Sequence, residues 1–312
     1  MKFARLILAI WLSANAMSNA NAQSPRSTSP LDRVWLEPKR PTQSQSDWYP
    51  QAIEQLEGRI VEFDDKQLSI AEGQTKDKTI VAARRVLWIE PGEVSDGEPR
   101  VIDAFENGDN RAVLADLAEV LKARPPVWRQ QWLTMLGANS AKLSGRAKIS
   151  LELVSQLDRR PLPAMVVAWA PIAWTPERSN DPTIQSSLAR LQDPSPLTQL
   201  VAASWLLSSS HRNDALETIQ TLATNEDRPS VMTLARCLLW TTASPPEVKA
   251  NYQQWLDELE TIPISLSVGP TVSLQRKLQA AGLSQAANAL EWSLELTPVH
   301  PHPALMTNRV SP

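Results

Sequence analysis

Apolar residues recur at helical spacing through the second two thirds of the chain. Four segments place them three or four positions apart, which is the pattern of a helix with one buried face: 113–121, 184–191, 231–239 and 248–259. Most of the 25 prolines lie between such segments and divide them into short helices. Because a short helix with one apolar side is not stable alone, the sequence predicts a mainly α domain over residues 100–298.

Residues 57–92 follow a different pattern, with short runs of strand-forming side chains at 59–63, 67–70, 79–81 and 86–89. The first two runs are joined by Asp64-Asp65-Lys66, a connection typical of a hairpin. The pattern predicts a small four-stranded antiparallel β-meander. Such a module is smaller than the roughly 40 residues that usually fold alone. It must therefore pack on the helices, which we expect, or complete a sheet with a partner.

The first 22 residues have the three parts of a secretory signal peptide. A basic start precedes an apolar stretch that is too short to cross a bilayer, and the small residues Ala20 and Ala22 precede a cleavage site before Gln23. The sequence thus predicts an exported protein, periplasmic or secreted. No later apolar run is long enough to cross a membrane, so we expect the mature protein to be soluble, without an integral membrane segment.

In two further segments the apolar residues show no regular spacing. Residues 23–56 are rich in Ser, Pro, Gln and Thr and read as an extended linker. Residues 299–312 are rich in proline and are expected to form a disordered tail.

A repeated spacing starts at each of three glycines. Gly108, Gly145 and Gly282 are each followed, five residues later, by a small or apolar residue and then by apolar residues at helical spacing. This spacing resembles the second half of a tetratricopeptide repeat. Residues 193–197 and 227–231, which lie 34 positions apart, share a pattern of acid, proline and apolar residue that resembles the helix start of a HEAT repeat.

The order of signal peptide, linker, β-module and helical repeats is similar to that of a group of uncharacterised exported bacterial proteins. The resemblances to tetratricopeptide and HEAT repeats imply a right-handed array of antiparallel helix pairs, an α-solenoid. The similarity to the exported bacterial proteins brings no known activity.

Charge and glycine content exclude several classes of function. The chain has 31 Lys and Arg against 34 Asp and Glu, a net charge of −3, which argues against a nucleic-acid-binding protein. Nine glycines, none closely spaced, rule out the phosphate-binding loops of P-loop and dinucleotide-binding proteins. The sequence predicts no cofactor.

Few residues offer reactive or metal-binding chemistry. Cys237 is the only cysteine and lies in an apolar helical segment, so a buried, inert thiol is expected. His300 and His302 have no third ligand nearby, and His211 has no nucleophile motif to support it. No catalytic residue and no metal site are therefore predicted.

Tryptophan is the unusual component, with 12 in the chain. Trp128 and Trp132 lie one helical turn apart, and Trp169 and Trp174 flank a proline. These indoles are either a candidate interaction surface, on which sugars or peptides stack, or the filling of grooves between helices. We expect groove filling.

Two functions remain open. The first is a non-enzymatic helical-repeat scaffold that binds a protein or peptide of the cell envelope, since stacked helices offer an extended concave surface. The second is a carbohydrate- or cell-wall-binding or cell-wall-active protein that uses exposed tryptophans and acidic residues. Exposure of the four indoles distinguishes these hypotheses.

Overall fold

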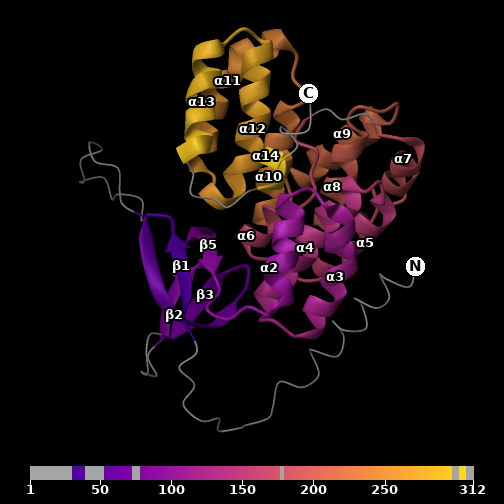
Figure 1. The fold of residues 1–312 in the computed structure, drawn as a ribbon. Helices are drawn as coiled ribbons and strands as arrows, with labels where there is room; N and C mark the ends of the chain where they lie inside the picture. The colour runs from indigo at the N-terminus through magenta and orange to yellow at the C-terminus, as the bar shows by residue number, and fades with distance from the viewer. Residues whose placement is uncertain (1–29, 39–52, 72–77, 176–178, 297–301, 307–312) are drawn as a thin grey trace, which may run out of the picture.

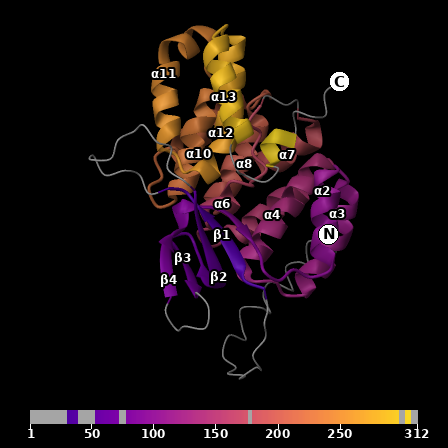
Figure 2. The ribbon, with the colours of Figure 1, turned by 60° about the vertical axis from the view of Figure 1, so that its left-hand side comes forward.

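The computed structural model describes residues 30–38, 53–71, 78–175, 179–296 and 302–306. In this part of the chain, a five-stranded antiparallel sheet is followed by 13 α-helices, so the protein is mainly α with a small N-terminal sheet. Figure 1 shows the sheet beside helices α2–α5, with α11–α13 rising above it. The view in Figure 2 gives the same arrangement from another side.

The sheet has the strand order β4-β3-β2-β1-β5. Its strands are β1 (Asp32–Leu36), β2 (Glu54–Phe63), β3 (Gln67–Ala71), β4 (Lys78–Ala82) and β5 (Val86–Glu90), with a 3-10 turn η1 (Ala83–Arg85) before β5. The hairpin predicted between residues 59–63 and 67–70 is confirmed and joins β2 to β3. Strands β4 and β5 lie where strands were expected.

The strand β1 corrects the prediction of a four-stranded meander and of a linker over residues 23–56. It lies between β2 and β5 and pairs with both in antiparallel register. The carboxylate of Asp32 ties it in place, because it accepts hydrogen bonds from the backbone N–H groups of Ile60 (2.9 Å) and Gly92 (2.9 Å). The sheet therefore has a fifth strand, which comes from the segment that composition marked as a linker.

One face of the sheet packs on the helices, as expected. Its buried residues, among them Val34, Leu68 and Ile70, form a hydrophobic cluster with Trp128 and Met165 from the helical part. Trp88 on β5 extends this contact, since its ring centroid lies 5.6 Å from that of Trp132 in an edge-on arrangement.

Thirteen helices make up the rest of the described chain. They are α2 (Gly97–Glu106), α3 (Asn110–Lys122), α4 (Val127–Leu143), α5 (Ala147–Leu157), α6 (Ala164–Val167), α7 (Asp181–Leu188), α8 (Pro196–Leu206), α9 (Arg212–Leu222), α10 (Pro229–Trp240), α11 (Pro245–Thr261), α12 (Ile264–Ala280), α13 (Ser284–Leu296) and α14 (Pro303–Met306). Most helices pack on the next helix along the chain, and one hydrophobic core runs through them.

The three glycines of the repeated spacing lie in the turns of helix pairs α2–α3, α4–α5 and α12–α13. Gly108, Gly145 and Gly282 have φ angles of +76°, +70° and +79°, a region that residues with a Cβ rarely adopt. In each turn the residue after the glycine donates a backbone hydrogen bond to a carbonyl five residues back. The spacing thus corresponds to three helix–turn–helix units.

Candidate binding groove

The predicted signal peptide, with Ala20, Ala22 and the cleavage site before Gln23, lies outside the described residues. Within the described ranges, no helix combines the length and hydrophobicity needed to cross a membrane.

The four tryptophans singled out from the sequence are buried, each 2 to 6 % exposed. Trp128 belongs to the core of the sheet, and Trp132 contacts Trp169 with ring centroids 4.9 Å apart. Trp174 packs on Gly269 of α12, where an added Cβ would lie 2.2 Å from the indole Nε1. These side chains fill contacts between elements, in agreement with groove filling, and form no exposed stacking surface.

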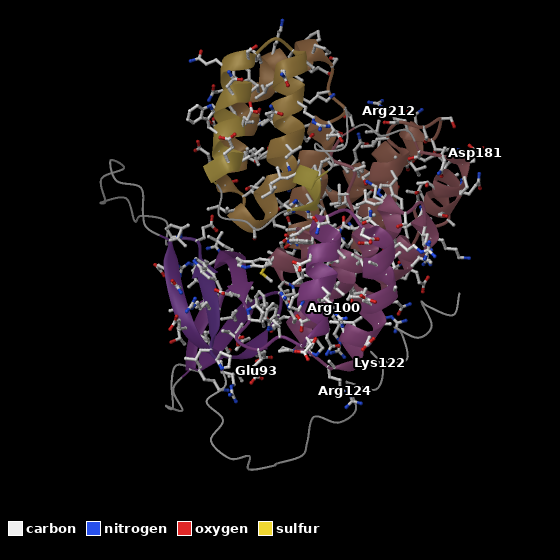
Figure 3. The ribbon with its side chains drawn as sticks, in the orientation of Figure 1. Glu93, Arg100, Lys122, Arg124, Asp181 and Arg212 are labelled. Carbon is white, nitrogen blue, oxygen red and sulfur yellow. The ribbon has the colours of Figure 1, made fainter. Side chains whose placement is uncertain are left out.

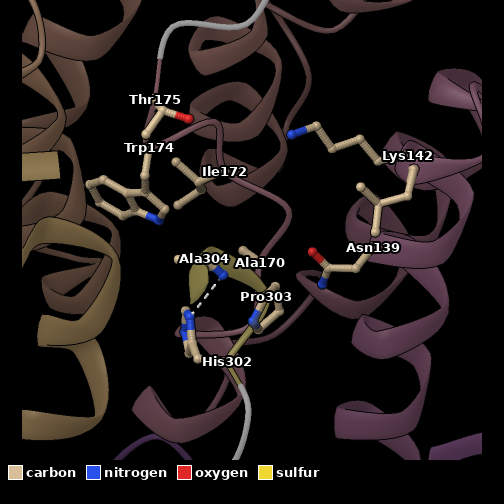
Figure 4. A pocket seen from close by; sticks show the side chains of 10 residues that line it. Asn139, Lys142, Ala170, Ile172, Trp174, Thr175, His302, Pro303 and Ala304 are labelled. Carbon is tan, nitrogen blue, oxygen red and sulfur yellow. Dashed lines mark hydrogen bonds between the residues drawn. The ribbon is translucent and has the colours of Figure 1, made fainter. Parts of the chain in front are cut away.

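His302 corrects part of the expected disordered tail of residues 299–312. It is buried, its Nε2 donates to the carbonyl of Ala168 (2.7 Å), and its ring packs 5.9 Å from that of Trp169. Figure 4 shows how it starts α14, with the backbone N–H of Ala304 donating to its Nδ1 (3.2 Å). These contacts anchor a segment that composition alone marked as disordered.

The cavity drawn in Figure 4 lies between α14, the end of α4 and the segment after α6. Its volume is about 20 Å³, which is space for a single water molecule. It is therefore too small to be a ligand site.

The remaining candidate side chains are separated from one another. Cys237 is buried, and burial raises the pKa of its thiol well above the usual value, which keeps it protonated and inert. His211 is at the start of α9, with Nδ1 3.3 Å from the carboxylate of Asp214. In the described part of the chain, no three His, Cys, Asp or Glu side chains are grouped as metal ligands.

A groove of about 450 Å³ lies between the sheet and the helices. On the sheet side it is bounded by Asp65 and Lys66 of the β2–β3 turn and by Arg84 of η1. On the helical side it is lined by the α5–α6 loop and by the first turns of α10 and α12. The groove is therefore built from four parts of the chain that are separated in sequence, namely the sheet region, the α5–α6 loop, α10 and α12.

The walls of the groove are largely apolar and rich in proline. The apolar residues that line it are Ala82, Pro161, Leu162, Ala164, Val167, Pro229, Val231, Pro263 and Leu266. Three of them are prolines that introduce or precede helices α6, α10 and α12, so their rings fix the backbone beside the groove. A rigid apolar wall loses little conformational freedom when a ligand covers it.

Arg228 supplies the best-anchored charge in the groove. Its guanidinium forms an ion pair with the fully buried carboxylate of Asp158. Asp158 also accepts hydrogen bonds from the Ser195 hydroxyl (2.7 Å) and from the backbone N–H of Leu197 (3.0 Å) at the start of α8. Burial lowers the pKa of Arg228, and the nearby carboxylate of Asp65 partly offsets this effect.

The charges at the rim of the groove have both signs. Lys66 and Arg84 are cationic, and Asp65 and Asp227 are anionic. Such a rim offers partners to both the N–H and the C=O sides of a peptide and to side chains of either charge. The groove thus combines apolar walls with charges of both signs.

None of the groove residues was predicted as a site residue from the sequence. The residues of the 227–231 repeat start do lie in the groove, so the HEAT-type pattern marked the segment but not its role. The β2–β3 turn was predicted as a hairpin, but nothing in the sequence joined it to the start of α10.

Comparison with protein-family models, with curated proteins and with solved structures found no match to this chain.

Proposed function

We propose that the protein is an exported, non-enzymatic helical-repeat scaffold that binds an extended segment of another cell-envelope protein in the groove between the sheet and helices α6, α10 and α12. The observation that carries the proposal is the groove itself. Its apolar, proline-rich walls suit the side chains of a peptide, and its mixed rim suits its polar groups.

The repeat architecture belongs to the same proposal. Sequential helix contacts and three glycine turns support a superhelical array of tetratricopeptide or HEAT type. In such an array the helix pairs provide the rigid frame, and the sheet docked on it closes one side of the groove.

The carbohydrate-binding alternative receives less support. The four indoles on which it depended are buried. Trp292 on α13 is 67 % exposed, but it is a single exposed indole and is not among the residues that line the groove.

Site-specific photo-crosslinking in cells tests the proposed function. A photoreactive amino acid at Ser230 or at Lys66 should capture the same segment of one envelope protein, because the two positions lie on opposite walls of the groove. The same amino acid at Glu291, on the exposed surface of α13, is the matched control. Adducts of equal yield at all three positions, or none at the groove positions, would contradict the proposal.

A groove-filling variant sharpens this experiment. Ser230→Trp should abolish the adduct formed from Lys66, since the indole would occupy the groove. Glu291→Trp adds the same side chain at a surface position and should leave the adduct unchanged.

Export is tested separately. Replacing Ala20 and Ala22 by bulky residues should leave an uncleaved precursor, because signal peptidases require small residues at these two positions. Mature protein that still begins at Gln23 would show that the cleavage site is assigned wrongly.

A further inference from the structure

A second pocket, remote from the groove, brings two cations together. It has a volume of about 270 Å³ and lies where the end of α8, the start of α9, the end of α10 and the last part of α12 meet. We propose that this pocket binds a phosphate-bearing small molecule, with Arg212 and Lys277 holding the phosphate group. Figure 3 labels Arg212 at its place on the helical body.

Both cations reach the same end of α10, Arg212 from an exposed position and Lys277 from a partly buried one. An Nη2 of Arg212 donates to the carbonyl of Thr242 (3.3 Å), and the Nζ of Lys277 donates to the carbonyl of Ala243 (2.9 Å). The acceptors belong to consecutive residues and both side chains line the pocket, so the two positive charges are near enough to repel each other. Burial lowers the pKa of Lys277, and the neighbouring charge of Arg212 lowers it further.

No carboxylate lines this pocket among the described residues. Glu247 acts on Lys277 from nearby, but its carboxylate already accepts hydrogen bonds from the backbone N–H (2.7 Å) and hydroxyl (2.6 Å) of Ser244. The first of these bonds is part of the capping box that begins α11. The acid therefore serves the helix end, and it does not bridge the two cations.

Helix capping accounts for only part of this arrangement. Cations at a helix C-terminus stabilise its last carbonyls. Among the described residues, Arg212 and Lys277 each donate one hydrogen bond to such a carbonyl. A lysine ammonium has three N–H donors and an arginine guanidinium has five. The other donors are available to a ligand in the pocket.

Hydroxyl groups complete the lining. Thr241 and Thr242 turn their hydroxyls back to the carbonyls of Leu238 and Leu239 (2.7 Å each). Thr175 and Ser208 also line the pocket and bring two more hydroxyl groups to it. These two groups are placed to donate to the oxygens of an anion held by the cations.

A phosphate monoester matches this lining in charge and in size. Its dianion balances the two positive charges, and its three terminal oxygens can accept from Arg212, Lys277 and a hydroxyl at once. The pocket volume of about 270 Å³ is large enough for several water molecules, so a small substituent fits beside the phosphate group.

Calorimetric titration of the full chain with inorganic phosphate at low, constant ionic strength tests the proposal. We expect saturable binding of one phosphate, weakened about tenfold or more by Arg212→Gln and by Lys277→Gln, since each removes a charged donor. Glutamine keeps a donor for the backbone carbonyls, and circular dichroism checks that both variants are folded.

Arg236→Gln is the matched control. The Nε of Arg236 donates to the carbonyl of Ala223 (2.9 Å) near the end of α9, so it is an arginine at a helix C-terminus outside the pocket. This variant should bind phosphate as the unmodified protein does. Equal loss of binding in Arg236→Gln and Arg212→Gln would reveal a non-specific charge effect and overturn the proposal.

Two further outcomes decide against a phosphate site. No saturable binding to the unmodified protein would leave Arg212 and Lys277 with the capping role alone. Acetate binding as tight as phosphate binding would show that the pocket selects a carboxylate, and the proposed ligand class would be wrong.

Discussion

The guanidinium of Arg129 lies over the indole of Trp132, 4.4 Å from the ring centroid. Its Nε donates to the carboxylate of Glu98 (2.8 Å), and the two charged side chains are 4 % and 2 % exposed. This buried ion pair joins α2 to α4. Burial lowers the pKa of Arg129, and its hydrogen bond and attraction to Glu98 oppose this effect.

Breaking this pair from one side should destabilise the protein strongly. Glu98→Gln leaves the Arg129 charge buried without its partner, so we expect the free energy of unfolding to fall by about 3–5 kcal/mol. Replacing both residues, Glu98→Leu with Arg129→Met, should recover most of the loss because no buried charge remains. Urea unfolding measures these differences.

The exposed pair Arg33–Glu57 is the control for this prediction. Its Nε–Oε1 distance is 2.9 Å, but both side chains are half exposed. Arg33→Gln should therefore cost less than about 1 kcal/mol. A cost as large as that of Glu98→Gln would show that burial is not what makes the Glu98 pair important.

Leu234 tests the core of the helical part. It is buried on α10, so Leu234→Ala should lower the free energy of unfolding by about 2–5 kcal/mol through lost burial and the cavity that remains. Leu143→Ala removes the same atoms from an exposed site at the end of α4 and should change it by less than about 0.5 kcal/mol. A loss below half a kilocalorie at Leu234 would contradict the buried position.

Acid should release α14. Burial lowers the pKa of His302 from 6.5 to about 4, against the opposing effect of its hydrogen bond to Ala168. Between these values the unfolded chain binds more protons than the folded one, so stability rises with pH from about 4 to 6.5 and falls on acidification. The shift in the pKa of His302 corresponds to a difference in the free energy of unfolding on the order of 3 kcal/mol. If only α14 detaches, the protein loses no more than the free energy that holds α14 in place.

NMR titration of the imidazole protons measures this effect. The His302 signal should shift only near pH 4, and the backbone amides of α14 should lose protection from exchange over the same range. His302→Gln removes the titrating group and should remove this pH dependence of α14. Titration of His302 at its ordinary pKa would contradict its burial.

The sheet should depend on both β1 and the helices. A fragment of residues 58–90 lacks β1, the neighbour of both β2 and β5, so we expect it to be unfolded. A fragment of residues 97–298, which keeps Glu98 with its partner Arg129, should keep its helical circular dichroism. Dispersed amide signals from the isolated 58–90 fragment would contradict this dependence.

Trp88→Ala examines the same contact in the full chain. Trp88 packs on Trp132 and lies against both hydrophobic clusters. We expect the variant to loosen the sheet, as seen in faster amide exchange of β5, without a loss of helical circular dichroism.

The helical part could be predicted because its signal is local. Val231, Leu234 and Leu238 recur at helical spacing, and all three are buried in α10. The positions of the turn glycines are also readable, since a positive φ favours glycine whatever the surroundings. These local patterns did not predict how the helices and turns pack against elements that are distant in sequence.

The strand β1 escaped prediction because its support is distant. Its five residues lie in a polar, proline-rich region, and its partners in β2 and β5 come later in the chain. The groove and the second pocket could not be predicted from the sequence for the same reason. Arg212 and Lys277 belong to helices that meet only in the folded chain, as do Lys66 and Ser230.

Strand β5 also packs against α12, a helix that comes much later in the chain. The strand ends at Glu90, whereas the helix begins at Ile264, so this contact can form only after most of the chain has been made. Contacts this far apart in sequence form slowly, and uncovered apolar strands aggregate. A chain that ends before α12 lacks this contact and should therefore aggregate more readily than the full chain.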